Sequence, residues 1–291
     1  MESFKKIARD ISIIENRVNG FENILLQTNE KNNTAGIVGI TGAPGAGKST
    51  LVDCLIQVLI NDRKKVAVLC VDPSSPFNMG ALLGDRIRMN KWYNNENVFI
   101  RSMASRKSLG GLSPMIIEVT EYLKIAGFDH IIIETVGVGQ NEIDIAGLAD
   151  VTVVVVVPEG GDEIQTMKSG IMEIANIFVV NKCDRPGADQ FVKFLHSMLA
   201  PVFKKSKYEI PIIKTVAEKG TGVESLYNSI REILNSDIIS EKKYYLLAEK
   251  AYHLIQLNRM ADVSKEQLVE SIRTISMADE HFNLYQFVKQ F

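Results

Sequence analysis

The protein has 291 residues, of which 46% are hydrophobic and 23% are charged, and its formal net charge is −2. A chain of this kind can bury a full core, and its near-neutral charge gives no reason to expect nucleic acid or an anionic membrane as a partner. No apolar run approaches the ~18 residues of a membrane span, and residues 1–9 lack the apolar segment of a signal peptide. We therefore expect a cytoplasmic location without a membrane span.

Strand and helix patterns alternate along most of the chain. Apolar residues at helical spacing predict two helices, over 3–18 and 21–27, and a polar linker follows at 30–34. Apolar and β-branched runs then predict strands over 36–41, 65–71, 98–101, 130–135, 151–157, 177–180 and 210–214. Helices are expected over 49–59, 81–92, 115–125 and 189–199. This alternation predicts an α/β fold with a mostly parallel, doubly wound sheet.

The loop after the first expected strand carries a phosphate-binding pattern. Gly42, Gly47, Lys48 and Ser49 satisfy G-x-x-x-x-G-K-[ST] between an apolar run and a helical pattern. Backbone N–H groups of such a loop converge on phosphate oxygens, the lysine reaches the β/γ oxygens, and the serine binds Mg²⁺. The alternative, a plain glycine-rich turn, is disfavoured by the flanking strand and helix. The expected nucleotide-binding residues here are Gly42, Ala43, Pro44, Gly45, Ala46, Gly47, Lys48, Ser49 and Thr50.

A second motif follows the strand expected at 177–180 and identifies the base. Asn181, Lys182 and Asp184 form Asn-Lys-x-Asp, the guanine reader of GTPases. The carboxylate of Asp184 can accept both the N1–H and the 2-amino protons of guanine, which adenine does not offer. This makes GTP the expected substrate and GDP the product. Val216, Ala217 and Glu218, after the last expected strand, occupy the place where GTPases pack backbone against the guanine.

Acidic residues at strand ends are candidates for the magnesium and γ-phosphate side of the site. Glu134 ends one strand and opens Glu-Thr-Val-Gly, in which Gly137 can meet the γ-phosphate. Asp72 ends another strand, and Asp85 lies in Gly-Asp-Arg; each could instead be a helix cap or an ion-pair partner. Val138 stands where Ras-type enzymes carry the water-orienting glutamine, which predicts slow hydrolysis without a partner.

Three segments are expected along the chain. They are a helical extension over 1–34, a P-loop GTPase domain over 35–236 and a helical arm over 237–291. The last segment shows no strand pattern, and its apolar residues at 245, 248, 251, 252 and 255 indicate long helices. Helices with little core of their own commonly pair across an interface, so we expect a homodimer.

Several runs resemble the MeaB/ArgK-type GTPases, which are G-protein chaperones of adenosylcobalamin-dependent methylmalonyl-CoA mutase. These runs are Asp-Pro-Ser-Ser-Pro at 72–76, Leu-Gly-Asp-Arg at 83–86, Glu-Thr-Val-Gly-Val-Gly-Gln at 134–140 and Gly-Asp-Glu at 161–163. The run at 134–140 is not shared by GTPases in general. The resemblance covers nearly the whole chain, although 77–81 is more apolar than is usual in that family and the last ~50 residues match only in character.

The resemblance implies roles for individual residues. Asp72, Asp85 and Glu134 match the family's acids around Mg²⁺ and the γ-phosphate, and Ser49 matches the direct Mg²⁺ ligand. Gln165 and Lys168 match a switch segment that contacts the mutase. In the family, the GTPase gates adenosylcobalamin loading and protects the mutase, its partner stimulates hydrolysis, and it forms homodimers. The cobalamin is expected to be bound by the client enzyme and not directly by this chain.

Three other functions are alternatives. A GTPase that inserts nickel needs Cys or His ligands near its switches, but His130 and His196 lack such spacing, and Cys54, Cys70 and Cys183 form no C-x-x-C pair. A kinase linked to amino-acid transport is disfavoured by the guanine motif. An inactive scaffold is disfavoured by the intact phosphate loop.

Overall fold

The computed structural model describes the chain in two compact units, Met1–Lys243 and Tyr244–Phe291. Each unit is described by itself. The residues that the structure describes are 3–26, 35–72, 89–104, 115–135, 141–159, 174–203, 209–236, 244, 248, 251–252, 254–256, 258–260, 262–278 and 282–290.

The first unit is built on a seven-stranded sheet in which every strand pair is parallel. Its strands are β1 (Gly36–Gly42), β2 (Val66–Asp72), β3 (Val98–Ala104), β4 (His130–Glu134), β5 (Val151–Val156), β6 (Ile177–Val180) and β7 (Ile212–Lys214). They lie in the order β3-β2-β4-β1-β5-β6-β7. The prediction of a parallel α/β fold is therefore confirmed.

The central strands are apolar because both faces of the sheet are covered. Every residue of β4 and of β5 is buried, as expected for near-continuous β-branched runs in a parallel sheet. β1 lies between them, with Ile40 opposite Glu134 and Gly42 opposite Val155. The carboxyl ends of these three strands therefore meet at one edge of the sheet, where ligands bind in open α/β folds.

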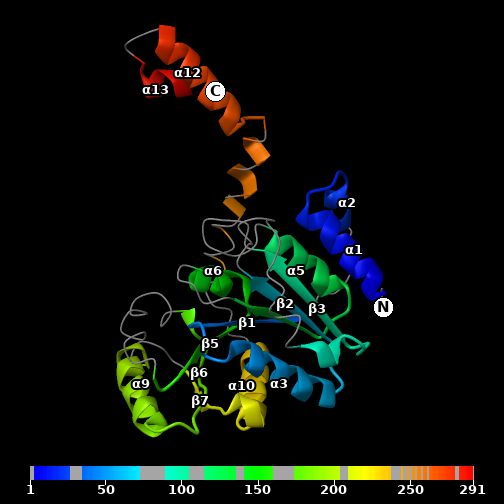
Figure 1. Ribbon diagram of the computed structural model, residues 1–291, viewed down its shortest axis with the longest axis vertical. Coiled ribbons are helices and arrows are strands. Elements are labelled where there is room, and N and C mark those ends of the chain that lie inside the picture. The colour runs from blue at the N-terminus through cyan, green and yellow to red at the C-terminus, as the bar shows by residue number, and fades with distance from the viewer. Residues whose placement is uncertain are drawn as a thin grey trace. The chain divides into compact units, whose positions relative to one another are not determined.

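Helices cover both faces of the sheet (Figure 1). α3 (Lys48–Asn61) and α10 (Val223–Leu234) lie on one face. α1 (Phe4–Glu15), α5 (Ile116–Ile125), α6 (Asn141–Leu148) and α9 (Ala188–Phe203) lie on the other. Successive side chains of a strand point to opposite faces of the sheet, so each strand contributes to both helix layers. On β1, Val38 and Ile40 face α3 and α10, whereas Ile37 faces α5 and α6.

The two expected N-terminal helices are present as α1 and α2 (Phe21–Leu26). Ile7, Ile11 and Ile14 of α1 are fully buried against the sheet layer, as their helical spacing predicts. Tyr122 on α5 donates a 2.8 Å hydrogen bond to Asp10, and Arg101 on β3 pairs with Glu15. α1 is therefore held to α5 and β3 by both apolar and polar contacts.

The helix expected over 81–92 differs from the structure at its carboxyl end. Only residues 89–92 of that span are described, and Asn90–Trp92 form a 3-10 turn, η2. The remainder of the expected helix lies outside the described residues. α6 and α10 were not singled out from the sequence, and the last strand begins at Ile212 instead of 210.

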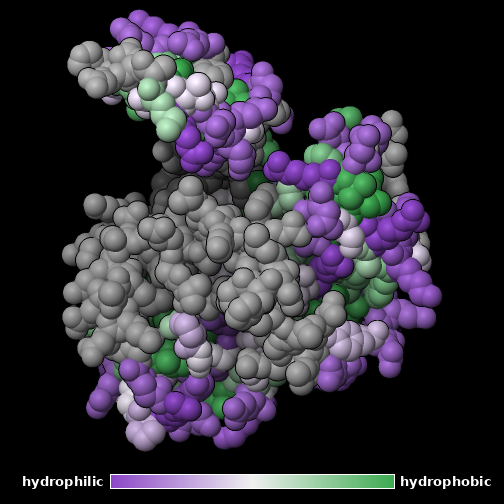
Figure 2. All heavy atoms as spheres, turned by 45° about the horizontal axis from the view of Figure 1, so that its top comes forward, coloured by the Kyte–Doolittle hydropathy of each residue, from purple (hydrophilic) through white to green (hydrophobic). Residues whose placement is uncertain are grey.

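The described residues of the second unit include two helices, α12 (Lys265–Ala278) and α13 (Leu284–Val288). Asn283 caps α13 by accepting hydrogen bonds from the backbone N–H groups of residues 285 and 286. Large apolar side chains are exposed on this unit, including Tyr252, Met277 and Tyr285, and Figure 2 shows apolar residues (green) among mostly hydrophilic ones (purple). In the part of the chain that the structure describes, no helix combines the length and apolar character needed to cross a membrane.

Candidate functional site

The loop between β1 and α3 requires glycine at both ends. Gly42 has a φ of 139°, and a Cβ there would lie 2.0 Å from the carbonyl oxygen of Val155 on the neighbouring strand. Gly47 has a φ of 87°, and its Cβ would lie 2.4 Å from Nδ2 of Asn181. Side chains are excluded at both positions by conformation and by space. The backbone of the loop is therefore packed tightly against the ends of two other strands.

Lys48 begins α3 and is almost fully buried, at 7% exposure. Its Nζ donates hydrogen bonds of 2.8 and 3.0 Å to the carbonyl oxygens of Gly42 and Ala43. These bonds fold the side chain back along the loop. Gly47, the N-cap of α3, offers no side-chain oxygen to the first turn, so this helix end carries the partial positive charge that favours an anion.

Ser49 and Glu134 meet at the base of the loop. The Ser49 hydroxyl donates a 2.6 Å hydrogen bond to Oε1 of Glu134, and both residues are buried. β4 ends at Glu134, directly beside β1, which positions its carboxylate under the first turn of α3. A hydroxyl and a carboxylate are the hard oxygen ligands that Mg²⁺ prefers. This pair therefore fits a magnesium ion next to bound phosphates.

Asn181 joins the two motifs recognised in the sequence. It follows β6, is 2% exposed, and its Nδ2 donates a 2.9 Å hydrogen bond to the carbonyl of Ala46 in the phosphate loop. Its Oδ1 accepts hydrogen bonds from the hydroxyl of Thr215, at 3.0 Å, and from the N–H of Ala217, at 3.1 Å. One buried amide thus connects the phosphate loop, the end of β6 and the segment after β7.

The other residues of the guanine motif lie beside this amide. Lys182 adopts a left-handed conformation, with a φ of 58°, and its Nζ donates a 2.7 Å hydrogen bond to the carbonyl of Gly45. The carboxylate of Asp184 is 3.3 Å from Nζ of Lys219. Both side chains of this ion pair are substantially exposed, so the pair contributes little to stability and the carboxylate stays accessible to a ligand.

The segment after β7 forms a short 3-10 turn, η3 (Ala217–Lys219). Ala217 is buried, and its carbonyl accepts a 3.0 Å hydrogen bond from the thiol of Cys54 on α3. Val216 is half-buried and Glu218 is exposed. Burial raises the pKa of the Cys54 thiol, and the adjacent Asp53 raises it further. The thiol therefore remains protonated and can act as a donor.

Asp53 on α3 also holds η2. Its Oδ1 accepts a 2.6 Å hydrogen bond from Nε1 of Trp92, and its Oδ2 is 2.7 Å from Nζ of Lys91. Trp92 is 5% exposed. The η2 turn is thereby anchored to the helix that begins with Lys48.

The structure describes only part of the predicted site. The phosphate loop, Glu134, the guanine motif and residues 216–218 lie at the carboxyl edge of the sheet. Asp72 is the last residue of β2, but its side chain lies outside the described part of the structure. Four further candidates also lie outside the described residues, namely Asp85, Gly137, Gln165 and Lys168.

Some residues at this edge were missed in the sequence. Thr41 and Thr135, which hydrogen-bond to each other, and Cys54 are examples. The sequence shows Thr41 directly before the phosphate-loop pattern and Thr135 directly after Glu134. Only the strand order, with β4 next to β1, brings the two side chains together.

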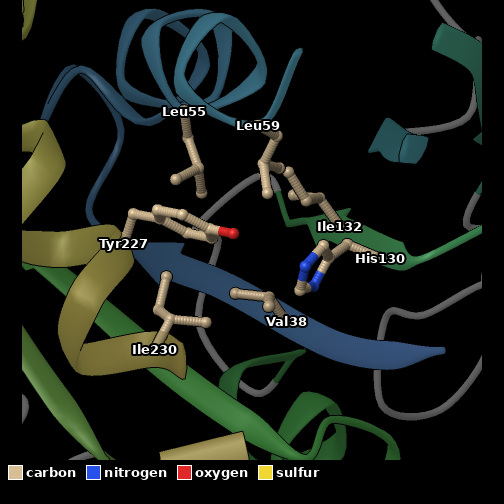
Figure 3. Close-up of a pocket in the computed structure, with 7 residues that line it drawn as sticks. All are labelled: Val38, Leu55, Leu59, His130, Ile132, Tyr227 and Ile230. Atoms are coloured by element: carbon tan, nitrogen blue, oxygen red, sulfur yellow. The ribbon is translucent and has the colours of Figure 1, made fainter. Parts of the chain in front are cut away.

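The pocket in Figure 3 lies away from this edge. It is small and apolar, and its lining residues are Val38, Leu55, Leu59, His130, Ile132, Tyr227 and Ile230. His130 is the first residue of β4, at the opposite end of that strand from Glu134. Its ring packs edge-on against Tyr227, whose hydroxyl donates a 2.6 Å hydrogen bond to Asp62. These contacts make His130 a core residue that packs α10 against the sheet.

Comparisons with known proteins identify the family to which the chain is similar. Residues 7–269 match the family model described as "Methylmalonyl Co-A mutase-associated GTPase MeaB". A putative GTPase of Pyrococcus horikoshii is 43% identical over 276 residues, covering 93% of this chain and 81% of that protein. The mouse methylmalonic aciduria type A homolog, a mitochondrial protein, is 34% identical over 207 residues, covering 70% of this chain and 50% of that protein.

Among solved structures, a LAO/AO transport system kinase superposes with a TM-score of 0.68. The match covers 98% of this chain and 90% of that chain, at 23% sequence identity. At this identity the likeness supports the fold alone.

Proposed function

The chain belongs to the MeaB family of methylmalonyl-CoA mutase-associated GTPases, and from this premise we propose that its GTPase cycle controls the loading of adenosylcobalamin into an acyl-CoA mutase. The observation that carries the GTPase part of the proposal is the Asn181 amide, which ties the phosphate loop to the guanine motif at one edge of the sheet. A nucleotide that spans both motifs would bring its phosphates to α3 and its base to Asp184.

We assign the binding of the β/γ-phosphates to Lys48 and to the N–H groups of residues 42–50. The buried ammonium and the first turn of α3 provide converging positive charge. Asp184 would read guanine through a bidentate contact, because its carboxylate is exposed and only weakly engaged by Lys219. Ala217, Val216 and Glu218 would border the base.

Magnesium would be held by the Ser49 hydroxyl, with Glu134 in the outer shell and, from their positions in the sequence, Asp72 and Asp85 as further acids. When bound, Mg²⁺ neutralises charge that develops on the β- and γ-phosphates. The Ser49 hydroxyl already donates a 2.6 Å hydrogen bond to Glu134, and this bond would leave the lone pairs of the Ser49 oxygen available to the metal.

Hydrolysis of GTP to GDP and phosphate would proceed by positioning and charge stabilisation, without a covalent enzyme intermediate. Gly137 would sense the γ-phosphate. Since Val138 offers no polar group to orient the attacking water, we expect slow turnover by the protein alone and faster turnover with its client.

The client enzyme would contact residues around Gln165 and Lys168, and it would hold the cobalamin itself.

We further propose a cytoplasmic homodimer and the segment boundaries 1–34, 35–236 and 237–291. The exposed apolar side chains of the C-terminal unit, such as Met277 at 84% and Tyr285 at 84%, support a role in self-association. Nickel insertion is the alternative; among the described residues, no group of three His, Cys, Asp or Glu side chains is placed to hold a metal ion.

The test is GTP turnover by the purified protein, alone and with a cobalamin-dependent acyl-CoA mutase from the same organism, with ATP as the control nucleotide. We expect slow GTP hydrolysis, stimulation by the mutase of at least about tenfold, and no ATP hydrolysis. Lys48→Ala should abolish the activity, which excludes a contaminating GTPase. If GTP hydrolysis is slow and no mutase changes its rate, the proposal that a mutase is the client is refuted, but the GTPase activity is not. If ATP is hydrolysed as fast as GTP, the assignment of the guanine motif is refuted.

A further inference from the structure

Two buried threonines hydrogen-bond to each other between the phosphate loop and the Glu134 motif. Thr41 is 0% exposed and Thr135 is 1% exposed. The hydroxyl of Thr135 lies 2.9 Å from the hydroxyl of Thr41 and donates to it. Their positions, 94 residues apart in the sequence, are at the carboxyl ends of the adjacent strands β1 and β4.

Each threonine is covalently next to a group that the proposed chemistry uses. Thr41 precedes Gly42, whose carbonyl accepts a hydrogen bond from Lys48. Thr135 follows Glu134, whose carboxylate accepts a hydrogen bond from Ser49. The hydroxyl pair therefore joins the start of the phosphate loop to the acid that lies below it.

A backbone bond reinforces this connection. The N–H of Thr135 donates a 3.0 Å hydrogen bond to the carbonyl of Ile40, which extends the β1–β4 ladder one residue beyond the end of β4. The side-chain and backbone bonds fix Thr135 against two successive residues of β1. Two bonds restrict both the separation and the rotation of the chain at this point, which one bond would not do.

We infer that Thr135 and Thr41 are positioning residues for GTP hydrolysis, which hold Glu134 at a fixed distance from the phosphate loop. This inference rests on the proposed GTPase function and gives a role to two hydroxyl groups to which the motifs assign none. A displacement of about 0.5 Å at a catalytic group is enough to lower the rate. Guanine binding should not depend on the pair, because Asn181 and Asp184 follow β6 and contact Thr215, Ala217 and Lys219 after β7, and neither residue bonds to Thr41 or Thr135 in the contacts described above.

A purely structural role is the competing explanation. Valine has nearly the shape of threonine and favours strands, so packing alone does not require a hydroxyl at either position. A buried hydroxyl that loses its partner costs stability, and this cost appears in Tm whether or not the hydroxyl lies near the site. Only a positioning role predicts a selective loss of the hydrolysis rate.

The experiment compares Thr135→Val, Thr41→Val, the double variant and Thr135→Ser in the full-length protein. Thr120→Val is the matched control, because Thr120 is also 0% exposed and its hydroxyl bonds within α5, to the carbonyl of Ile116. The measurements are the single-turnover rate of GTP hydrolysis, the Kd for GDP, the Mg²⁺ concentration for half-maximal rate, and Tm.

We expect each valine variant to lower the rate at least fivefold and to raise the Mg²⁺ requirement, with the Kd for GDP within about threefold of wild type. The double variant should lose no more than either single variant, because both remove one shared bond. Thr135→Ser should retain the wild-type rate within about threefold. Thr120→Val should lower Tm and leave the rate unchanged.

Any of three outcomes would overturn the inference. The valine variants could lose less than fivefold in rate, Thr120→Val could lose as much rate as they do, or the losses of the two single variants could multiply in the double variant. If a valine variant does not fold, Thr41→Ser against Thr41→Ala gives the same comparison of a hydroxyl kept and lost. A wild-type protein that neither binds nor hydrolyses GTP would refute the proposed function and the inference with it. Normal wild-type activity with unaffected valine variants would refute only the inference.

Discussion

Replacement of Asn181 by alanine should weaken nucleotide binding and folding together. The change removes three buried hydrogen bonds, to Ala46, Thr215 and Ala217. At about 1 kcal/mol each, their loss lowers the free energy of unfolding by about 3 kcal/mol, which corresponds to a fall in Tm of about 6–12 °C for a unit of this size. The lost bond to Ala46 also frees the phosphate loop from the guanine motif, and we expect the Kd for GDP to rise at least about tenfold, or ~1.4 kcal/mol.

The assay is isothermal titration with GDP, combined with thermal unfolding, and Asn176→Ala is the control. Asn176 precedes β6, at the opposite end of that strand from Asn181, and its Oδ1 accepts a 2.8 Å hydrogen bond from the N–H of Thr152 on β5. This control should lower Tm without changing the Kd for GDP. If Asn181→Ala binds GDP with wild-type affinity, or if Asn176→Ala weakens binding equally, the amide does not couple the two motifs.

Two further predictions concern base selection and pH. Asp184→Asn should shift the preference at least tenfold from GTP towards xanthosine triphosphate, measured by competition binding, because the amide donates a hydrogen bond where the carboxylate accepted one; an unchanged preference would contradict the assignment. Burial lowers the pKa of His130, an effect opposed by Asp129 and Asp62 and assisted by Lys64. The folded state therefore favours the neutral imidazole ring of His130. This contribution to the free energy of unfolding is complete above pH 6.5, the ordinary pKa of histidine, and is lost as the pH falls below that value. The loss is at most ~1.4 kcal/mol per pH unit. Urea unfolding between pH 5 and 7.5 measures how the free energy of unfolding depends on pH. This dependence should be weaker in His130→Gln and unchanged in His196→Gln, which replaces an exposed residue of α9. The same pH dependence in His130→Gln as in the wild-type protein would contradict the prediction.

The sequence predicts the sheet well because its strands are strongly apolar and buried on both faces. Runs such as 151–157 are short, apolar and β-branched, which favours a strand buried on both faces. The phosphate-loop pattern marks the end of β1 independently. α10 was also visible in principle, since Val223, Leu226 and Ile230 repeat at helical spacing and are buried. α6 gives a weaker signal, because its larger apolar residues, Ile143, Ile145 and Leu148, are mixed with glycine and alanine over only eight residues.

The contacts within the site could not be predicted in this way. Motif spacing brings Ser49 and Glu134 to the same edge, but the 2.6 Å bond between them depends on β4 lying next to β1. The same holds for Thr41 and Thr135. Strand order is set by packing of the whole domain, and local patterns carry little information about it.

The contact between Trp92 and Asp53 has a practical consequence. The chain contains one tryptophan, and its indole N–H is bonded to the helix that begins at the phosphate loop. The intrinsic tryptophan fluorescence therefore originates from a single position between α3 and η2. Titration with GTP or GDP can be followed optically on the unlabelled protein, and a change in emission reports an altered environment of this one indole.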